Sequence, residues 1–361
     1  MSVFLTSLLG TLPGAVAQGL IWGIMAIGVY ITFRILDLAD LTVDGSICTG
    51  AAVCTILVRN GMNIWVAGLI SCLVGVTVGI AVYTILVRRG MNTWLAVLIS
   101  WLVGIAASSA VCTILVHIKM NILLAILISF LVGLIAGCVT GFFHISLGIP
   151  AILAGILTQL MLYSVNLKIL AGANLALSSR TYQVVITSSR IPQALLVLAV
   201  TMAIIVAVLY FFFGTELGSA IRATGSNPEM SRAQSINTNI TKLLGFALSN
   251  AFVALSGAML AQYQGSADIN MGRGAIVIGL ASVIIGEAIF RKFSRNFALK
   301  LLSVFVGAII YYMVLQIVIF IGADTDLLKM MSAFVVAVFL GVPYLKKQHF
   351  TKAKIGVNKN A

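Results

Sequence analysis

Residues 55–83 read TILVRNGMNIWVAGLISCLVGVTVGIAVY, residues 84–112 read TILVRRGMNTWLAVLISWLVGIAASSAVC, and residues 113–141 read TILVHIKMNILLAILISFLVGLIAGCVTG. These stretches repeat with a period of 29 residues, and each joins a short polar break to about 23 apolar residues. A helix of that length is about 35 Å long, which is enough to cross a bilayer once. The repeats therefore predict a tandemly triplicated transmembrane helix near residues 55–141 rather than a solenoid.

Two additional copies of a spanning helix add an even number of crossings. Every later segment therefore keeps its side of the membrane, and the charge distribution of the remaining chain is preserved. Two interpretations of the extra copies stay open. They are functionally neutral, or they alter a surface that faces a partner or lipid.

The composition predicts a membrane protein. Of the 361 residues, 61% are hydrophobic and 9% are charged, whereas an average soluble domain has about 25% charged residues. So little polar surface excludes a soluble enzyme, a disordered chain and a collagen-like chain. We therefore expect an all-α polytopic transmembrane bundle with about eleven spans. The spans are expected near residues 15–33, 43–58, 63–85, 93–115, 122–143, 150–170, 193–213, 243–263, 275–290, 301–321 and 330–345.

Three segments depart from a simple span. Residues 43–58 and 275–290 are short and contain glycines or polar residues, which predicts broken or re-entrant helices. Residues 1–12 are expected to form a short interfacial helix. The whole of 1–345 is then one transmembrane domain, and 346–361 is a basic tail.

The net charge of +13 does not indicate nucleic-acid binding, because basic residues of membrane proteins gather in cytoplasmic loops. Placing the basic tail inside also places the basic clusters near 34, 88–89, 222–242 and 291–300 inside. Asp268, Asp324 and Asp326 then lie outside. This bias predicts an outside N-terminus and a cytoplasmic C-terminus.

Enzyme motifs are missing from the sequence. It contains no G-x-x-x-x-G-K-[ST], H-E-x-x-H or G-x-S-x-G pattern. His117, His144 and His349 are far apart, and the five cysteines lie in apolar runs without C-x-x-C spacing. We expect no metal site, no catalytic residues, and cysteines that are reduced and pack as small apolar side chains.

The largest internal polar segment, residues 214–242, is expected to face the cytoplasm. Gly225-Ser-Asn-Pro228 is a turn signal, and Asn227 can cap a short helix with Pro228 at its first position. That helix would run through Met230 to Ile236. Such a helix could dock into a groove on a partner, or the segment could be an ordinary solvated loop.

Four stretches together resemble one family. The string Arg222-Ala-Thr-Gly225-Ser-Asn227-Pro228 with Arg232-Ala233 is similar to the cytoplasmic loop of ABC importer permeases of the branched-chain amino acid/ribose type. Residues 242–258 resemble the next helix of that family. Asp40-Leu-Thr42 resembles its Asp-Leu-Ser/Thr motif, and His144 to Thr158 resembles the helix opening after its third span. Residues 30–45 look closest to a subgroup linked to amino-acid, tryptophan-type uptake. The chain departs from the pattern in its extra helices and in Glu287, which follows Gly286 where a second glycine is expected.

The resemblance implies a permease subunit in the plasma membrane that performs no covalent chemistry and needs no cofactor. A separate cytoplasmic ATPase would bind ATP, an extracytoplasmic solute-binding protein would deliver the solute, and a second permease copy would complete a homodimer in the lipid bilayer. Arg222 and Arg232 would pair with acidic groups of the ATPase, or would only follow the charge bias. The residues that the resemblance assigns to ATPase coupling are Arg222, Ala223, Thr224, Gly225, Asn227, Pro228, Arg232, Ala233 and Gln234.

Polar residues near the broken segment have two open roles. Asp40, Thr42 and Asp44 would line the solute pathway or brace a broken helix, and Asp44 is expected to cap a helix starting at Gly45. Gly45, Pro150 and Thr158 belong to the same group of candidates. Glu287 is expected to pair with Arg291 at i,i+4 spacing. The outer loop from Ser178 to Arg190 could receive a binding protein or be solvated. Two rival functions also stay open: an ion-gradient secondary transporter and a non-transporting membrane scaffold.

Overall fold

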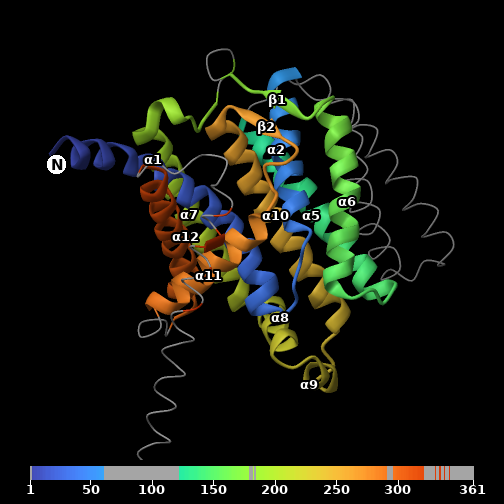
Figure 1. Cartoon of the computed structure of the whole chain (residues 1–361). Helices are drawn as coiled ribbons and strands as arrows, with labels where there is room; N and C mark the ends of the chain where they lie inside the picture. Colours follow the sequence, from blue (N-terminus) through green and yellow to red (C-terminus); the bar gives the residue numbers. More distant parts are fainter. Residues whose placement is uncertain are drawn as a thin grey trace, which may run out of the picture.

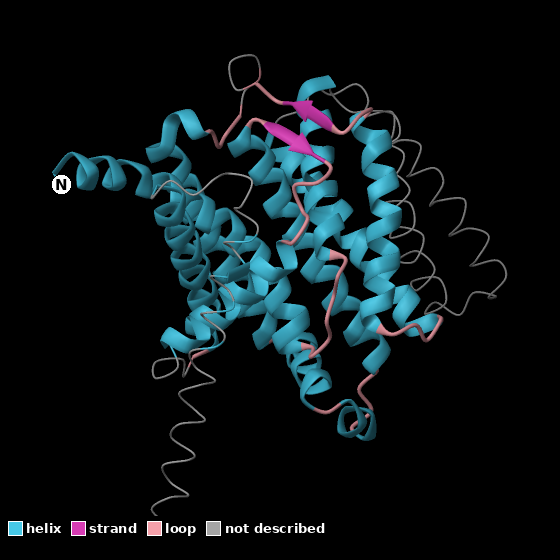
Figure 2. Cartoon of the chain, in the orientation of Figure 1, coloured by secondary structure: helices cyan, strands magenta, loops and turns pink. Residues whose placement is uncertain are grey.

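A computed structural model describes residues 2–60, 122–178, 182, 184–290 and 296–320, together with Met330, Ala333, Phe334, Ala337 and Gly341. The described chain is almost entirely helical (Figures 1 and 2). Its helices are α1 Ser2–Tyr30 with the π-helical η1 Ile31–Ile35, α2 Val43–Asn60, α5 Ile122–Ser146, α6 Ala151–Leu170, the 3-10 helix η2 Ser188–Arg190, α7 Ile191–Gly214, α8 Glu216–Ser226, α9 Pro228–Ala233, α10 Thr238–Gln264, α11 Ala275–Phe290 and α12 Phe297–Phe320. Two short strands, β1 Asn174–Ala176 and β2 Ser266–Asp268, form one antiparallel pair.

The all-α polytopic prediction is confirmed. Within the described residues, 6 helical segments are long and apolar enough to cross a membrane, and α11 is a shorter apolar helix. Predicted spans 63–85 and 93–115, most of 330–345 and the tail 346–361 lie outside the described residues, so the expected count of about eleven spans stays a prediction. Residues 1–12 do not form a separate helix, because α1 runs without interruption from Ser2 past Pro13, and their expected position at the membrane interface stays a prediction.

The start of the repeated unit is corrected. Residues 55–60 are the last turns of α2, so the first unit begins inside a helix rather than at a loop. The apolar part of the third unit forms most of α5. The other parts of the repeats, and therefore the triplication of the helix, lie outside the described residues.

Helix α10 lies at the centre of the bundle and packs against α5, α2 and α1 (Figure 1). Small residues allow the backbones to approach closely. A Cβ at Gly137 of α5 would collide with the carbonyl of Phe246 on α10, and a Cβ at Gly19 of α1 would collide with the backbone of Ile309 on α12. Each of these glycines belongs to a G-x-x-x-G pair, Gly133 with Gly137 and Gly19 with Gly23, and both pairs serve contacts within this chain.

The two ends of the bundle differ. At one end, α8 packs against η1 and lines a cavity together with η1 and α11, and the short α9 follows α8 (Figure 1). At the opposite end, β1 and β2 pair with Asn174 opposite Asp268 (Figure 2). The sequence prediction assigns the first end to the cytoplasm.

Two helices begin inside the bundle, as predicted for the short segments. After η1, residues 36–42 return into the bundle as a non-helical segment before α2 starts (Figure 1). Residues 269–274 likewise lead from β2 into the bundle before α11 starts. The starts of α2 and α11 lie together, because the backbone of Gly272 approaches the Asp44 carbonyl and Ile47.

Candidate functional site

The start of α2 is held by a buried network of hydrogen bonds. The Asp40 carboxylate accepts from the Thr42 backbone N–H at 2.9 Å and from the Asn250 amide of α10 at 2.7 Å. The Asn250 side-chain oxygen accepts from the Ser46 hydroxyl at 2.6 Å. Asp40 is only 2% exposed, and Ser46 and Asn250 are fully buried. The network ties the broken segment to the central helix, which is how a buried carboxylate is tolerated in an apolar bundle.

Asp44 caps a helix, but a different one from the one predicted. Helix α2 starts at Val43 rather than Gly45, so Asp44 already lies in its first turn. The Asp44 carboxylate accepts from the backbone N–H of Gly274 at 3.0 Å and of Ile276 at 3.1 Å. Those groups are the unpaired donors at the start of α11, where a carboxylate is favoured. Asp44 therefore connects the starts of the two broken helices.

Helix α6 packs against the broken segment on its other side. Gly155 of α6 approaches the backbone of Leu41, and the Thr42 hydroxyl contacts the Thr140 hydroxyl of α5 at 2.7 Å. Thr158 is buried and donates to the Ala154 carbonyl, while Pro150 precedes the first residue of α6. Gly45 offers its carbonyl to the Asn166 amide at 3.5 Å. The structure thus brings the candidates Asp40, Thr42, Asp44, Gly45 and Thr158 into one buried region, and their role in a solute pathway stays a prediction.

Sequence reasoning missed helix α8, which replaces the expected turn at Gly225. Thr215 caps α8 by accepting from the Gly218 N–H at 3.3 Å. Gly225 lies in the last turn of α8, where a Cβ would collide with the carbonyl of Ile35 at the end of η1. The glycine is therefore needed for close helix approach and not for a turn. Thr224 is 1% exposed and its hydroxyl contacts the Thr241 hydroxyl of α10 at 2.9 Å.

The predicted cap of α9 is confirmed. The Asn227 side chain accepts from the Met230 N–H at 3.0 Å, and Pro228 is the first helical residue. The helix ends at Ala233, with Gln234 as its C-cap, which is shorter than the predicted run to Ile236. The Arg232 guanidinium donates to the Thr238 hydroxyl at 2.9 Å. Apart from Ser231, the residues of α9 are exposed, and Met230 is 60% exposed.

Replacing Asn227 by alanine is expected to loosen α9 without unfolding the bundle. Loss of one N-cap costs about 1 kcal/mol, which corresponds to about fivefold faster hydrogen exchange of the α9 amides. Asn239→Ala is the matched control, because Asn239 contributes only its backbone N–H to the neighbouring cap. Equal exchange rates in Asn227→Ala and the wild type, measured by mass spectrometry, would contradict the capping role.

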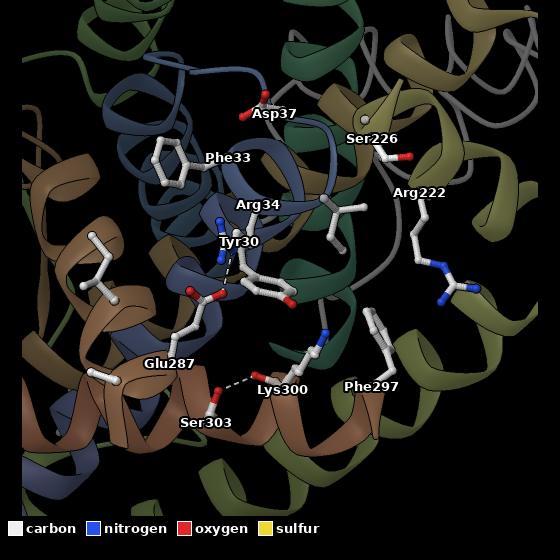
Figure 3. A pocket seen from close by; sticks show the side chains of 14 residues that line it. Tyr30, Phe33, Arg34, Asp37, Arg222, Ser226, Glu287, Phe297, Lys300 and Ser303 are labelled. Carbon is white, nitrogen blue, oxygen red and sulfur yellow. Dashed lines mark hydrogen bonds and ion pairs between the residues drawn. The ribbon is translucent and has the colours of Figure 1, made fainter. Parts of the chain in front are cut away.

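A cavity of about 890 Å³ opens at the same end of the bundle. It lies between η1, α8, α11 and α12, and Arg34, Arg222, Glu287 and Lys300 are among its lining residues (Figure 3). Arg34 and Glu287 point toward each other and form an ion pair at 2.8 Å. The Arg222 guanidinium lies 5.7 Å from the centre of the Phe297 ring. Arg222 therefore borders the cavity, and its pairing with a partner protein stays a prediction.

The ion pair involves a residue that sequence spacing did not suggest. Glu287 was expected to pair with Arg291, which lies outside the described residues, whereas the structure pairs Glu287 with Arg34 from a distant part of the chain. Asn250 was also missed, although an amide side chain in an apolar span is itself a signal. The pairing partners could not be read from spacing, because they come from different helices.

The expectation of no metal site concerned His and Cys residues. Within the described residues no group of three or more His, Cys, Asp and Glu side chains is placed to hold a metal ion. Cys48 and Cys54 are free and buried. His144 places its Nδ1 atom 2.8 Å from the Ile149 carbonyl, where it supports the turn before α6. Cys72, Cys112, His117 and His349 lie outside the described residues.

The similarity to known proteins extends over most of the chain. A family model described as branched-chain amino acid transport system / permease component matches residues 12–109 and 99–342. The tyrosine transport system permease protein of Clostridioides difficile (strain R20291) is 32% identical over 323 residues, which is 90% of this chain and 88% of that protein. The autoinducer 2 import system permease protein of Yersinia pseudotuberculosis serotype O:3 (strain YPIII) is 27% identical over 42% of this chain and 44% of that protein. The xylose transport system permease protein of Haemophilus influenzae is 33% identical over 27% of this chain and 25% of that protein. No solved structure matches.

Proposed function

The chain belongs to the family of permease components of branched-chain amino acid transport systems, and on this premise we propose that it is the membrane subunit of an ATP-driven importer of an amino acid. It would provide the path across the plasma membrane, while ATP is bound and hydrolysed by a separate cytoplasmic ATPase. The observation that carries this proposal is the segment α8–α9, which is exposed at one end of the bundle and firmly attached to it.

The attachment of α8 and α9 suits a part that transmits force. Gly225 seats α8 against the end of η1, and the Thr224–Thr241 contact and the Arg232–Thr238 bond hold the segment to α10. A displacement of the exposed α9 would therefore reach both α1 and α10. ATP-driven closure of a docked ATPase could in this way switch the bundle between outward-open and inward-open states.

The exposed side chains of this segment are better suited to contact with a partner protein than to contact with water. Leu217, Met230 and Ile240 are large apolar side chains that are each more than half exposed. The basic Arg222 and Arg232 of the same stretch of chain are also exposed. Apolar anchors surrounded by charged groups are typical of docking surfaces. We assign this end to the cytoplasm and the β1–β2 end, with the loop toward Arg190, to contact with a solute-binding protein.

The choice of an amino acid as solute rests on a relative that matches 90% of this chain and is named for tyrosine transport. As the family resemblance implies, a second permease copy would complete the path. The many exposed apolar residues of α6 and α7 are available for lipid or for that second copy.

The two alternative functions predict different experimental results. An ion-gradient transporter would move its solute with an inactive ATPase, and it would use an ionisable group exposed to the pathway. Among the described carboxylates, Asp40 is buried in hydrogen bonds and Asp44 caps α11, which favours neither as an ion relay. A non-transporting scaffold would bind no ATPase.

The test is purification of the tagged chain from its native membrane in mild detergent, with identification of the proteins that accompany it. We expect an ATPase and a solute-binding protein in the wild-type sample, and loss of the ATPase when Arg222 and Arg232 are both changed to glutamate. Arg190→Glu makes the same type of substitution at the opposite end of the bundle and should keep the ATPase. A chain that purifies alone under several mild conditions contradicts the importer.

A further inference from the structure

A second cavity is lined by helix α1, the loop before α11, the first turn of α11 and helix α12. Its volume is about 510 Å³, within the range of about 300–1,000 Å³ that small-ligand sites occupy. Six of its lining residues are aromatic or polar: Gln18, Trp22, Arg273, Tyr311, Tyr312 and Gln316. Trp22 lies near the middle of the apolar segment Gly10–Ile35, so the cavity lies at membrane depth.

One wall of this cavity is aromatic. The rings of Trp22 and Tyr312 are stacked, with centroids 5.8 Å apart and planes at 27°. Tyr311 meets Tyr312 edge to face at 5.5 Å, which holds the Tyr312 ring in place. Trp22 is only 7% exposed, so its position is set by packing. A fixed aromatic wall of this kind favours a flat aromatic ring over an aliphatic chain.

The remaining lining residues supply polar groups that an apolar bundle does not need for packing. Arg273 stands in the loop just before α11, and its side chain is exposed where it borders the cavity. A guanidinium at membrane depth is costly unless it faces water or a ligand. It is also the group best suited to bind a carboxylate through two parallel hydrogen bonds. Gln18 and Gln316 add amide oxygens that can accept from an ammonium group, and amide N–H groups that can donate.

We propose that this cavity holds the transported solute, and that the solute is an amino acid with an aromatic side chain. Its ring would lie against Trp22 and Tyr312, its carboxylate would face Arg273, and the amides of Gln18 and Gln316 would bind its ammonium group. The inference rests on the proposed importer function and adds the site and the substrate class. Size and chemistry both fit, because the cavity joins an aromatic wall to one cationic group among its described lining residues.

The experiment uses the complete importer, with its ATPase and binding protein, reconstituted in lipid vesicles. Uptake of radiolabelled L-tyrosine, L-phenylalanine and L-leucine is measured for the wild type, Trp22→Leu and Arg273→Gln. We expect the wild type to take up the aromatic amino acids in preference to leucine. Trp22→Leu should lower aromatic uptake about tenfold while changing leucine uptake less, since only a ring gains from stacking. Arg273→Gln should lower the uptake of all three, because all carry the carboxylate.

The control removes an aromatic pair elsewhere. Phe130 of α5 meets Phe252 of α10 edge to face at 5.4 Å, away from the cavity lining. Phe130→Leu should leave the preference for aromatic amino acids unchanged, and co-purification of the ATPase checks that each variant is assembled. Uptake by Trp22→Leu equal to the wild type, or an equal loss of leucine and aromatic uptake, overturns this site. An assembled importer that carries a different solute class also overturns it. Absence of any ATPase-dependent uptake by the wild type would instead overturn the proposed function.

Discussion

Replacement of Asp44 by alanine is expected to destabilise the folded chain by about 2–4 kcal/mol, because two backbone N–H groups at the start of α11 lose their acceptor. The donors are those of Gly274 and Ile276. The turns before α11 give backbone acceptors to the N–H groups of Arg273, Ala275 and Val277. The N–H groups of Gly274 and Ile276 bond to the carboxylate instead. Thermal unfolding of the purified chain in detergent should show a clearly lower midpoint, and less folded protein should be recovered.

Two variants make this expectation specific. Asp44→Asn keeps one side-chain oxygen and should lie between alanine and the wild type. Asp268→Ala is the matched control, because the Asp268 carboxylate accepts from the Asn270 N–H within its own exposed turn. Equal midpoints for Asp44→Ala and Asp268→Ala would show that the cap of α11 contributes nothing.

Replacement of Gly225 by valine is expected to abolish import while the membrane bundle stays folded. The new side chain would collide with the Ile35 carbonyl and with the Leu36 backbone, so α8 must move away from η1. The contact between α8 and α1 is then lost, and ATP hydrolysis by a docked ATPase would no longer reach the bundle. Uptake should fall at least about a hundredfold, since misplacement of about 1 Å in a coupled site has effects of that size.

The measurement pairs uptake with thermal unfolding in the same preparation. Gly214→Val is the control, because no atom outside its chain neighbours and its own helix backbone lies within 4 Å of a Cβ built at Gly214, which lies two residues before α8 starts at Glu216. The control should transport as the wild type does. Normal uptake by Gly225→Val would mean that the contact between α8 and η1 is dispensable.

Much of the helical architecture could be predicted, because spans are set by local properties. A helix in lipid must be about 20 residues long and apolar throughout, and this signal is contained in each segment. The Asn227 cap was likewise predictable, since the donor and acceptor are three residues apart. The glycines and polar residues of the short segments 43–58 and 275–290 predicted broken helices.

The contacts between segments could not be predicted in the same way. Asp44 was expected to cap its own helix. Its carboxylate oxygens instead accept hydrogen bonds from the start of α11, where Gly274 lies 230 residues further along the chain. Glu287 was assigned to a neighbour on its own helix, whereas Arg34 lies opposite it in space. Gly225 was interpreted as a turn residue because glycine serves both turns and close packing, and only the approach of Ile35 distinguishes them. The cavity with Trp22 and Arg273 combines three segments that no single stretch reveals.

The glycines through which α5 packs against α10 recur in part in the other two repeated units. A Cβ at Gly133 or Gly137 would collide with the α10 backbone or with Ala254, so any helix occupying this place needs the smallest residues there. The first repeated unit carries Gly75 and Gly79 at the equivalent positions, whereas the second carries Gly104 and Ser108. By sequence, the first unit therefore keeps both glycines of the contact between α5 and α10, and the second unit keeps one of them.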